Sequence, residues 1–184
     1  MKEIRIHGRA GQGAITTATL LAWAAFEEGQ ESLAFPHFGA ERMGAPMNAF
    51  VRLDREPIRE RTQVRQPDYV LVLDSTLLRG YDILAGVKPG AVAVVNTTLK
   101  AQDLGLKGAR VVAVPASRIA EEVIGRADRS NTALLGALAA ATGVVSLEAL
   151  KKAARSNFPG PVGEKNALAM EKAYEFVKNQ EGKP

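Results

Sequence analysis

Short apolar runs alternate with longer helix-forming stretches along the whole chain. Continuous apolar runs of four or five residues are typical of parallel strands that are covered on both faces. Two further runs, on either side of a glycine-rich connection, also have the composition of strands. The strands that the pattern predicts are Ile4–His7, Leu33–Phe38, Met47–Leu53, Tyr69–Leu73, Ala91–Val95 and Val111–Val114.

Helical patterns fall between or after these runs. The first predicted helix is followed by Gly29, the residue type best suited to a left-handed C-cap. Residues 158–163, Phe-Pro-Gly-Pro-Val-Gly, predict an irregular linker that sets the last helix apart as a covering or partner-facing element. The predicted helices are Ala14–Glu28, Ile119–Ile124, Asn131–Thr142, Leu147–Ser156 and Glu164–Lys178. We therefore expect one domain over residues 1–184, an α/β three-layer sandwich with a mostly parallel, Rossmann-like sheet.

The amino-acid composition excludes several kinds of functional site and partner. The chain has 184 residues, no cysteine, 5% aromatic residues and a formal net charge of +4. Without cysteine it has no disulfide, no thiolate nucleophile and no cysteine ligand for zinc or an iron–sulfur cluster. Charge is spread along the chain and no basic tract appears, so nucleic acid is not an expected partner. No stretch of about 20 apolar residues and no apolar signal region is present, and we expect a cytoplasmic protein without a membrane segment.

The loop after the first predicted strand, Gly-Arg-Ala-Gly-Gln-Gly at 8–13, leads directly into a helix. Glycines let the backbone approach a ligand closely, and the first N–H groups of a helix attract phosphate. The spacing GxxGxG differs from the dinucleotide fingerprint GxGxxG, and no Gly-Lys-Ser/Thr follows as in a P-loop. A purely structural strand-to-helix turn is the alternative. The candidate ligand contacts are Gly8, Arg9, Gly11, Gln12 and Gly13.

Polar residues also follow the later predicted strands. They are Asp74 and Ser75, Asn96, and Ser117. Ligands collect at the carboxyl ends of parallel strands, which favours a binding role. The same residue types are preferred helix N-caps, and this structural interpretation is the more common one.

A second unusual segment spans Phe35–Pro46. It places Glu-Arg between two glycines and two prolines, which concentrates charge and sharp turns in a short connection. Arginine offers a planar fork for a carboxylate or phosphate, and the glutamate can pair across a subunit interface. A solvated loop with an incidental charge pair is the alternative. The partner-facing or ligand-facing candidates are His37, Gly39, Glu41, Arg42 and Gly44.

The histidines argue against autonomous catalysis. His7 and His37 are the only two in the chain, and no Ser-His-Asp arrangement, zinc helix or pair of catalytic carboxylates is evident. We expect core or hydrogen-bonded roles for the two histidines, and polar contacts near one shared cleft are the alternative. Lys165, with Asn166, stands at the start of the last predicted helix, where a solvated position is the simpler interpretation.

The two unusual segments together resemble the gamma subunit of 2-oxoacid:ferredoxin oxidoreductases, most closely that of the pyruvate enzyme. The resemblance covers nearly the whole chain and extends to Asp74-Ser75, to Asn131 with Leu134-Leu135-Gly136, and to Lys165-Asn166. Two positions depart from the family pattern. Ala10 stands where glycine is usual, and Met43 stands where a second arginine often follows Arg42.

This resemblance implies a subunit of a complex that converts pyruvate and coenzyme A to acetyl-CoA and carbon dioxide with reduction of ferredoxin. Thiamine diphosphate and the iron–sulfur clusters then belong to the alpha, beta and delta subunits, which suits a chain without cysteine. The gamma chain would flank the active site, help to bind coenzyme A through the 8–13 loop, and have no activity alone. A 2-ketoisovalerate or 2-oxoglutarate enzyme, one subunit shared by two enzymes, and a purely structural subunit remain open. An independent nucleotide-binding enzyme needs a ribose-binding acid after the second strand, where only Glu41 stands.

Overall fold

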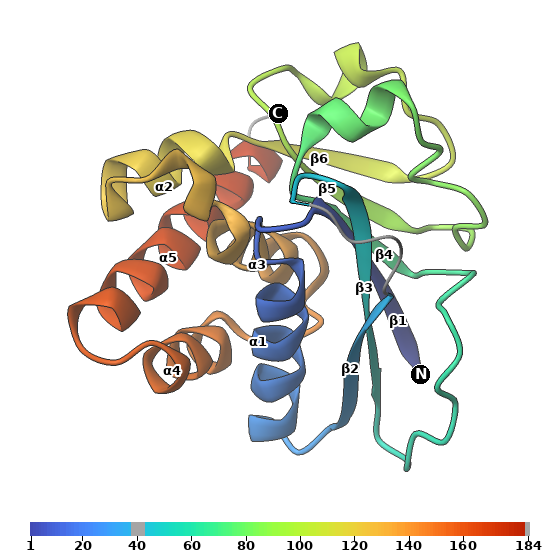
Figure 1. Ribbon diagram of the computed structural model, residues 1–184, viewed down its shortest axis with the longest axis horizontal. Coiled ribbons are helices and arrows are strands. Elements are labelled where there is room, and N and C mark those ends of the chain that lie inside the picture. The colour runs from blue at the N-terminus through green and yellow to red at the C-terminus, as the bar shows by residue number, and fades with distance from the viewer. Residues whose placement is uncertain (38–42, 183–184) are drawn as a thin grey trace.

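A six-stranded sheet forms the centre of the computed structural model, which describes residues 1–37 and 43–182 (Figure 1). The strand order is β2-β3-β1-β4-β5-β6. Strands β1, β4, β5 and β6 pair in parallel, and β3 pairs antiparallel with both of its neighbours. The mostly parallel α/β sheet predicted from the sequence is therefore confirmed. The strands are β1 (Lys2–Arg9), β2 (Glu31–His37), β3 (Pro46–Asp54), β4 (Tyr69–Val72), β5 (Val92–Asn96) and β6 (Arg110–Val114).

The α-helices gather on one side of the sheet, with α3 in the middle of the helical layer (Figure 1). The other face of β4 and β5 is covered by short 3-10 helices and loops, which bury a second apolar cluster around Val70, Val95 and Ile83. The third layer of the sandwich thus consists of 3-10 helices and loops in this region. The helices are α1 (Ala14–Glu27), α2 (Ala116–Ile124), α3 (Asn131–Thr142), α4 (Leu147–Asn157), α5 (Pro161–Glu181), η1 (Ser75–Arg79), η2 (Ala101–Leu104) and η3 (Ala127–Arg129).

The end of α1 agrees with the prediction from Gly29. This residue has φ 76°, its N–H donates to Phe26 O at 2.9 Å, and the N–H of Gln30 donates to Ala25 O at 3.0 Å. That pair of bonds is the Schellman arrangement, in which a left-handed glycine satisfies the last carbonyls of a helix.

The linker predicted over 158–163 is wrong in its second half. Helix α5 begins at Pro161, because proline has the backbone φ of a first helical residue and needs no N–H there. Only Phe158–Gly160 connects α4 to α5. Helix α5 is also not set apart, since its buried residues Met170 and Ala173 belong to the main apolar core. Helix α2 likewise begins at Ala116, three residues before the predicted start.

The crossing of α3 and α5 is the tightest contact in the helical layer. A Cβ atom at Gly136 would lie 1.9 Å from the backbone oxygen of Met170. One turn earlier, the hydroxyl of Thr132 donates to Asn166 Oδ1 at 2.8 Å, and Asn166 Nδ2 donates to Val162 O at 2.8 Å. The two helices therefore approach at backbone distance, and only glycine fits at this position of α3.

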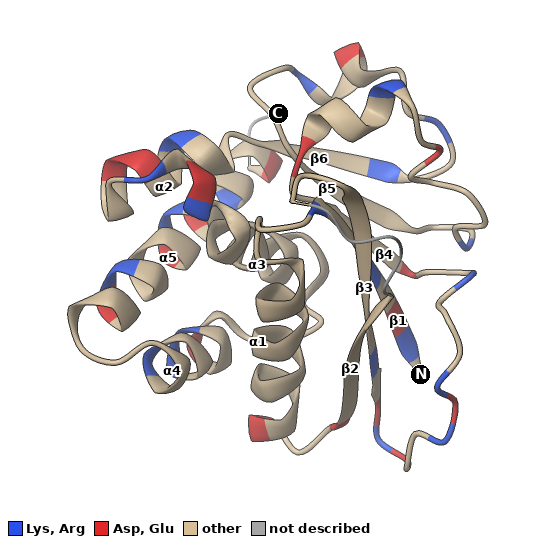
Figure 2. Cartoon of the chain, viewed as in Figure 1, with Lys and Arg blue, Asp and Glu red and all other residues tan. Residues whose placement is uncertain are grey.

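Charged residues are distributed according to this layering. Figure 2 shows α1 without charge along most of its length, whereas α2, α4 and the loop after β3 carry many charges. Helix α1 has eight buried residues, among them Leu20, Leu21 and Ala25, and packs against the sheet. The charges lie on the outer helices and loops, where water solvates them.

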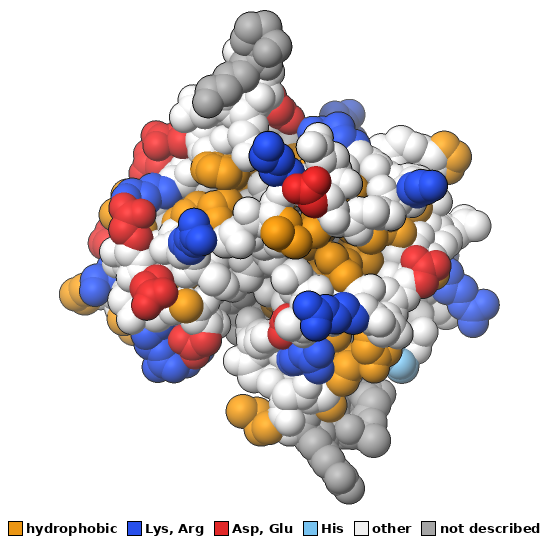
Figure 3. All heavy atoms as spheres, turned by 90° about the horizontal axis from the view of Figure 1, so that it is seen from above, with side chains coloured by type: hydrophobic (Ala, Val, Ile, Leu, Met, Phe, Trp, Pro, Cys, Tyr) orange, Lys and Arg blue, Asp and Glu red, His pale blue; other side chains and the backbone are white. Residues whose placement is uncertain are grey.

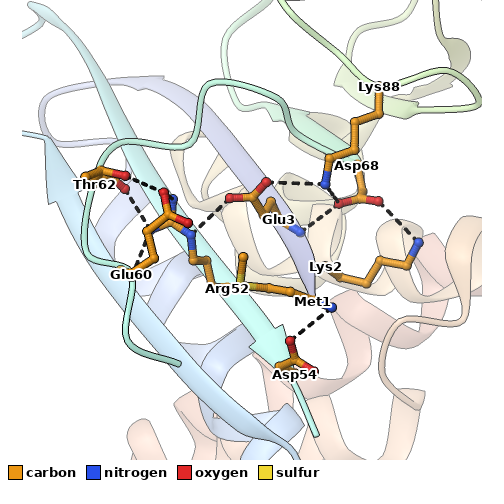
Figure 4. A network of polar contacts seen from close by, with 9 residues as sticks. All are labelled: Met1, Lys2, Glu3, Arg52, Asp54, Glu60, Thr62, Asp68 and Lys88. Carbon is orange, nitrogen blue, oxygen red and sulfur yellow. Dashed lines mark hydrogen bonds and ion pairs between the residues drawn. The ribbon is translucent and has the colours of Figure 1, made fainter. Parts of the chain in front are cut away.

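Strand β1 separates two different environments. Ile4 and Ile6 are fully buried in the main core, while Glu3, Arg5 and His7 alternate with them and face the other side of the sheet. This second face of β1 and β3 combines charged side chains with the buried ring of Phe50. It carries the buried Arg52, whose side chain is 1% exposed, and the network of charges drawn in Figure 4.

Candidate functional site

The glycine loop connects the end of β1 to the start of α1. Gly11 has φ 96° and Gly13 has φ 79°, both in the left-handed region that other residues avoid. Gly13 is the N-cap of α1, no side chain caps this end, and the first turn contains no acidic residue. The first-turn N–H groups of α1 therefore have no side-chain acceptor, and anion binding by the 8–13 loop stays a prediction.

Asn131 at the start of α3 lies directly behind the loop. Its side-chain nitrogen would be 2.9 Å from a Cβ atom at Gly13, and the residue is 7% exposed. Position 13 therefore requires glycine for two reasons, its positive φ angle and the Asn131 amide that packs against it. Asn131 contributes to the shape of the loop.

Arg9 and Gln12 hold the loop against the turn after β4. Arg9 Nε donates to Asp74 Oδ2 at 3.1 Å, and Gln12 Nε2 donates to the same oxygen at 2.9 Å. The N–H of Arg9 also donates to Gln12 Oε1 at 2.8 Å. Thr76 accepts from Arg9 Nη2 at 2.9 Å. The structure therefore brings four residues from two strand ends into one polar cluster.

Asp74 is the common acceptor of this cluster. Its Oδ1 accepts from the N–H of Thr76 at 2.9 Å, so it also caps η1, as the N-cap interpretation predicts. Partial burial raises the pKa of the Asp74 carboxyl, but hydrogen bonds from Thr76 and Gln12 and the charge of Arg9 outweigh burial. The pKa therefore lies below its ordinary value, and Asp74 is ionised at neutral pH.

The second unusual segment lies next to the glycine loop. The N–H of Ala10 donates to Ala45 O at 2.9 Å, and the N–H of Gly44 donates to Ala10 O at 3.2 Å. Arg9 Nη1 also donates to Gly44 O at 3.1 Å. The side chain of Met43 would be 3.1 Å from a Cβ atom at Gly11. Gly39, Glu41 and Arg42 lie outside the described residues, so their predicted roles remain predictions.

A cavity of about 370 Å³ adjoins the glycine loop at the carboxyl ends of β4 and β5. Gln12, Asp74, Asn96 and Ser117 line it together with Ser130. Asn96 Nδ2 donates to Leu73 O at 3.0 Å and to Ser117 Oγ at 2.9 Å, and its Oδ1 accepts from the N–H of Ser117 at 3.1 Å. The predicted gathering of polar residues at the strand ends is thus confirmed. Ser117 lies inside the first turn of α2 and is not its N-cap.

The two histidines line one cavity of about 490 Å³ on the other face of the sheet, which is the alternative interpretation of these residues. Arg5 Nε donates to His7 Nε2 at 3.1 Å. Burial, and next the charge of Arg5, lower the pKa of His7 to about 4, so this ring is neutral at pH 7 and accepts a hydrogen bond. His37 lies at the end of β2, where both of its ring nitrogens are within 3.0 Å of Gln63 Nε2.

Sequence reasoning missed two buried arginines. Arg5 is 8% exposed and Arg52 is 1% exposed. Each arginine stands between two apolar residues of a predicted strand. A charged residue inside an apolar strand was the sequence signal that could have identified them. Asn166 is buried in the contact between α3 and α5, whereas Lys165 is exposed. The simpler interpretation of Lys165 as a solvated residue is therefore confirmed.

Among the helices of residues 1–37 and 43–182, none combines the length and the hydropathy of a membrane span. In the same ranges, no group of three or more His, Asp or Glu side chains is arranged to hold a metal ion.

Comparison with known proteins places this geometry in a family. The family model described as pyruvate ferredoxin/flavodoxin oxidoreductase matches residues 3–176. The chain belongs to this family. The matched span includes the glycine loop, the cluster around Asp74 and the crossing of α3 and α5.

Curated relatives are similar over nearly their whole length. The pyruvate synthase subunit PorC of Methanosarcina barkeri is 51% identical over 182 residues, which cover 98% of this chain and 100% of that protein. The common gamma subunit of the pyruvate/ketoisovalerate oxidoreductases of Thermococcus kodakarensis is 49% identical over 178 residues, 95% of this chain and 96% of that protein.

Solved structures of related subunits have the same fold. The pyruvate oxidoreductase subunit PORC of Thermotoga maritima superposes with a TM-score of 0.84 at 40% identity, covering 95% of each chain. The gamma subunit of a keto/oxoacid ferredoxin oxidoreductase from Geobacter sulfurreducens gives 0.78 at 28% identity, covering 97% of this chain and 99% of that one. These matches confirm the resemblance to gamma subunits of 2-oxoacid:ferredoxin oxidoreductases. This chain is therefore a gamma-type subunit of an oxidoreductase.

Proposed function

We propose that the chain is the gamma subunit of a complex that converts pyruvate and coenzyme A to acetyl-CoA and carbon dioxide while reducing ferredoxin. In this complex it flanks the active site, and its glycine loop contacts coenzyme A. Support for the oxoacid comes from the relatives, which are named for pyruvate synthase or for pyruvate and ketoisovalerate oxidoreductases together. One gamma chain that serves two enzymes is compatible with both names.

The uncapped N-terminus of α1 is the observation that carries the coenzyme A proposal. A phosphate placed there would accept hydrogen bonds from the first-turn N–H groups, and the glycines leave room for its approach. Hydroxyl groups of Ser75, Thr97 and Ser117 line the neighbouring cavity, where they can bond to further polar groups of a ligand. The residues present therefore fit the diphosphate of coenzyme A.

A 2-oxoglutarate:ferredoxin oxidoreductase from Magnetococcus marinus was solved with coenzyme A and succinyl-CoA bound. Its chain superposes on this protein with a TM-score of 0.78 at 23% sequence identity. Only 31% of that longer chain is covered. The likeness motivates coenzyme A as the ligand, while the choice of contact residues rests on the loop itself.

Arg9 would supply the positive charge of the contact. Its side chain is 32% exposed and already forms an ion pair with Asp74. A phosphate near the loop would meet a carboxylate as well as a guanidinium, so Arg9 has to neutralise Asp74 while it faces the ligand. Its role is to bind and orient, and no proton transfer is assigned to it.

Companion alpha, beta and delta subunits would complete the complex in the cytoplasm. Thiamine diphosphate and iron–sulfur clusters on those subunits would supply the oxidative chemistry and the electron path to ferredoxin. On the face of this chain shown in Figure 3, hydrophobic side chains gather in the middle with charged side chains of both signs around them. Ile15 and Met43, next to the glycine loop, are 42% and 86% exposed. Apolar surface of this kind is typical of subunit contacts.

The test is the substitution Arg9→Ala in the assembled complex. Loss of one charge-assisted contact to phosphate is expected to raise the KM for coenzyme A about 10-fold, with unchanged subunit stoichiometry. Arg79→Ala is the matched control, because Arg79 is an exposed arginine at the end of η1 that does not line the cavity at the strand ends. An unchanged KM for coenzyme A in the Arg9→Ala complex would overturn the cofactor contact.

A purely structural subunit is the second candidate, and one observation favours it. Arg9 directs its side-chain donors to Asp74, Thr76 and Gly44 of its own chain, as a residue does that only fixes a loop. On this alternative, Arg9→Ala lowers the amount of gamma chain in the purified complex and leaves the KM unchanged. Assays of the native complex against pyruvate, 2-ketoisovalerate and 2-oxoglutarate identify the oxoacid.

A further inference from the structure

Strand β6 is one of the two outer strands of the sheet. The N–H of Arg110 donates to Ala91 O, and Val114 O accepts from the N–H of Thr97. In a pair of parallel strands, every second residue of one strand directs both its N–H and its C=O group toward the other strand. The backbone groups of Val111 and Ala113 therefore point away from β5, toward the free edge. No hydrogen bond joins them to another backbone group within residues 1–37 and 43–182.

This edge lies in a groove with two walls. The groove has a volume of about 520 Å³ and is lined by Arg110–Ala113 of β6, with Thr97–Ala101 on one wall and Phe176, Val177, Gln180 and Glu181 of α5 on the other. Leu99, on the first wall, is 57% exposed. A strand edge inside a groove with an apolar side chain at its rim has the form of an extended-peptide site, in which main-chain bonds provide affinity and the walls provide specificity.

The other outer strand offers a poorer edge. Strand β2 contains Pro36, which has no N–H to donate, and proline is a common means of protecting an edge from added strands. Strand β6 has no proline, and Pro115 follows only after its last residue. Of the two edges, β6 is therefore the one suited to accept another strand.

The charged side chains that line the groove indicate the charge of the segment that it can bind. Lys100, Arg110 and Arg118 line it, against the single carboxylate of Glu181. Arg110 is already paired with Glu181 at 3.0 Å. Neither Lys100 nor Arg118 forms an ion pair with any residue that the structure describes. The groove therefore presents two available positive charges beside an open strand edge, and a segment with acidic side chains complements it.

We propose that an extended acidic segment of another subunit of the oxidoreductase adds to the edge of β6 and continues the sheet. Its backbone bonds to Val111 and Ala113, and its carboxylates face Lys100 and Arg118. The inference rests on the membership of this chain in a multi-subunit family and is independent of coenzyme A binding. A short segment matching the five residues of β6 is long enough.

Hydrogen exchange in the assembled complex tests the main-chain contact. The amides of Val111 and Ala113 are expected to exchange at least about 10-fold more slowly in the wild-type complex than in a complex carrying Lys100→Glu. Lys100 is chosen because it lines this groove and not the cavity next to the glycine loop. Lys107→Glu, at an exposed position outside the groove, is the matched control and is expected to leave the protection unchanged.

A second variant addresses the backbone directly. Val111→Pro removes an N–H that β5 does not use, and the substitution is expected to lower the stoichiometry of the partner subunit in the purified complex. Rapid exchange of the Val111 and Ala113 amides in the wild-type complex would overturn the proposal. Slow exchange that Lys100→Glu leaves unaltered would overturn the acidic partner. If the KM for coenzyme A rises in the Arg9→Ala complex while the Val111 and Ala113 amides exchange rapidly in the wild-type complex, the edge contact is wrong and the loop contact is supported.

Discussion

Arg9 Nε lies 3.1 Å from Asp74 Oδ2, and this pair joins the glycine loop after β1 to the turn after β4. The two residues are separated by 65 positions in the sequence. Gln12 bonds to the same carboxylate oxygen at 2.9 Å, so the loop is attached at both of its long polar side chains. The carboxyl ends of two neighbouring parallel strands are thereby fixed relative to each other, which positions the N-terminus of α1 beside the cavity at the strand ends.

Replacing Asp74 with asparagine tests this attachment. Asp74→Asn keeps an oxygen that can cap η1 but removes the charge that faces Arg9, and a loss of about 1 kcal/mol in the free energy of unfolding is expected. Urea denaturation of the purified chain measures it. Asp103→Asn, an exposed acid in η2, is the control. Equal stability of the wild type and Asp74→Asn would show that the pair contributes nothing net.

Gly136→Ala is expected to be severely destabilising. The added methyl would lie 1.9 Å from Met170 O, so α3 and α5 must move apart, with a loss of about 3 kcal/mol in the free energy of unfolding. Gly125→Ala provides a comparison, because Gly125 has φ 86° but open space around its Cβ position. Only the backbone strain of about 1 kcal/mol applies there. Similar midpoints of thermal unfolding for the two variants would contradict the close helix crossing.

Arg52→Met is expected to lower the free energy of unfolding by about 3 kcal/mol. Removal of the guanidinium leaves the partly buried Glu3 with Lys88 as its remaining cation, and it leaves the carbonyl oxygens of Glu60 and Thr62 without this donor. Arg52 Nε donates to Glu3 Oε1 at 3.0 Å, and Nη1 donates to Glu60 O and Thr62 O at 3.1 and 2.7 Å (Figure 4). The loop after β3 loses its main anchor in this variant.

Limited proteolysis of that loop provides a second readout for Arg52→Met, and faster cleavage between Glu56 and Gln66 is expected. Arg55→Met is the matched control, since Arg55 is exposed at the end of the same strand. Wild-type cleavage rates in Arg52→Met would mean that the loop is held by other contacts.

The partly buried His7 predicts a pH dependence of stability. The folded-state pKa is about 4, below the ordinary value of 6.5, so the unfolded chain binds a proton that the folded chain does not bind between these values. Stability is therefore complete above pH 6.5 and decreases as the pH falls toward 4, by an amount on the order of 3 kcal/mol. Carboxyl groups with lowered pKa values, such as Asp68 and Asp74, lose their contribution only at lower pH.

His7→Gln is the variant that isolates this effect. Glutamine retains an oxygen that can accept from Arg5 but does not titrate, so the slope of stability between pH 6.5 and 4.5 is expected to become flatter. The measurement is the urea midpoint of both proteins across this range. An unchanged slope would assign the pH dependence to other groups.

Local structure was predictable from the residues themselves. Helix α3 begins and ends at the predicted residues, Asn131 and Thr142, because a polar start, an alanine- and leucine-rich interior and a terminal glycine are all local signals. The start of α5 was misjudged because Pro161 has two roles, as a breaker in a linker and as a first helical residue, and the local sequence does not distinguish them.

The sequence by itself determined the α/β class, the order and type of the main strands and helices, and the glycine loop as a candidate anion site, since these depend on periodicity and on the conformational freedom of glycine. Tertiary structure alone decided which partners those residues have. Asp74 is the acceptor for Arg9, Asn131 packs behind Gly13, and Val111 lies on an open edge, because strand order and helix packing bring together residues that no local pattern connects.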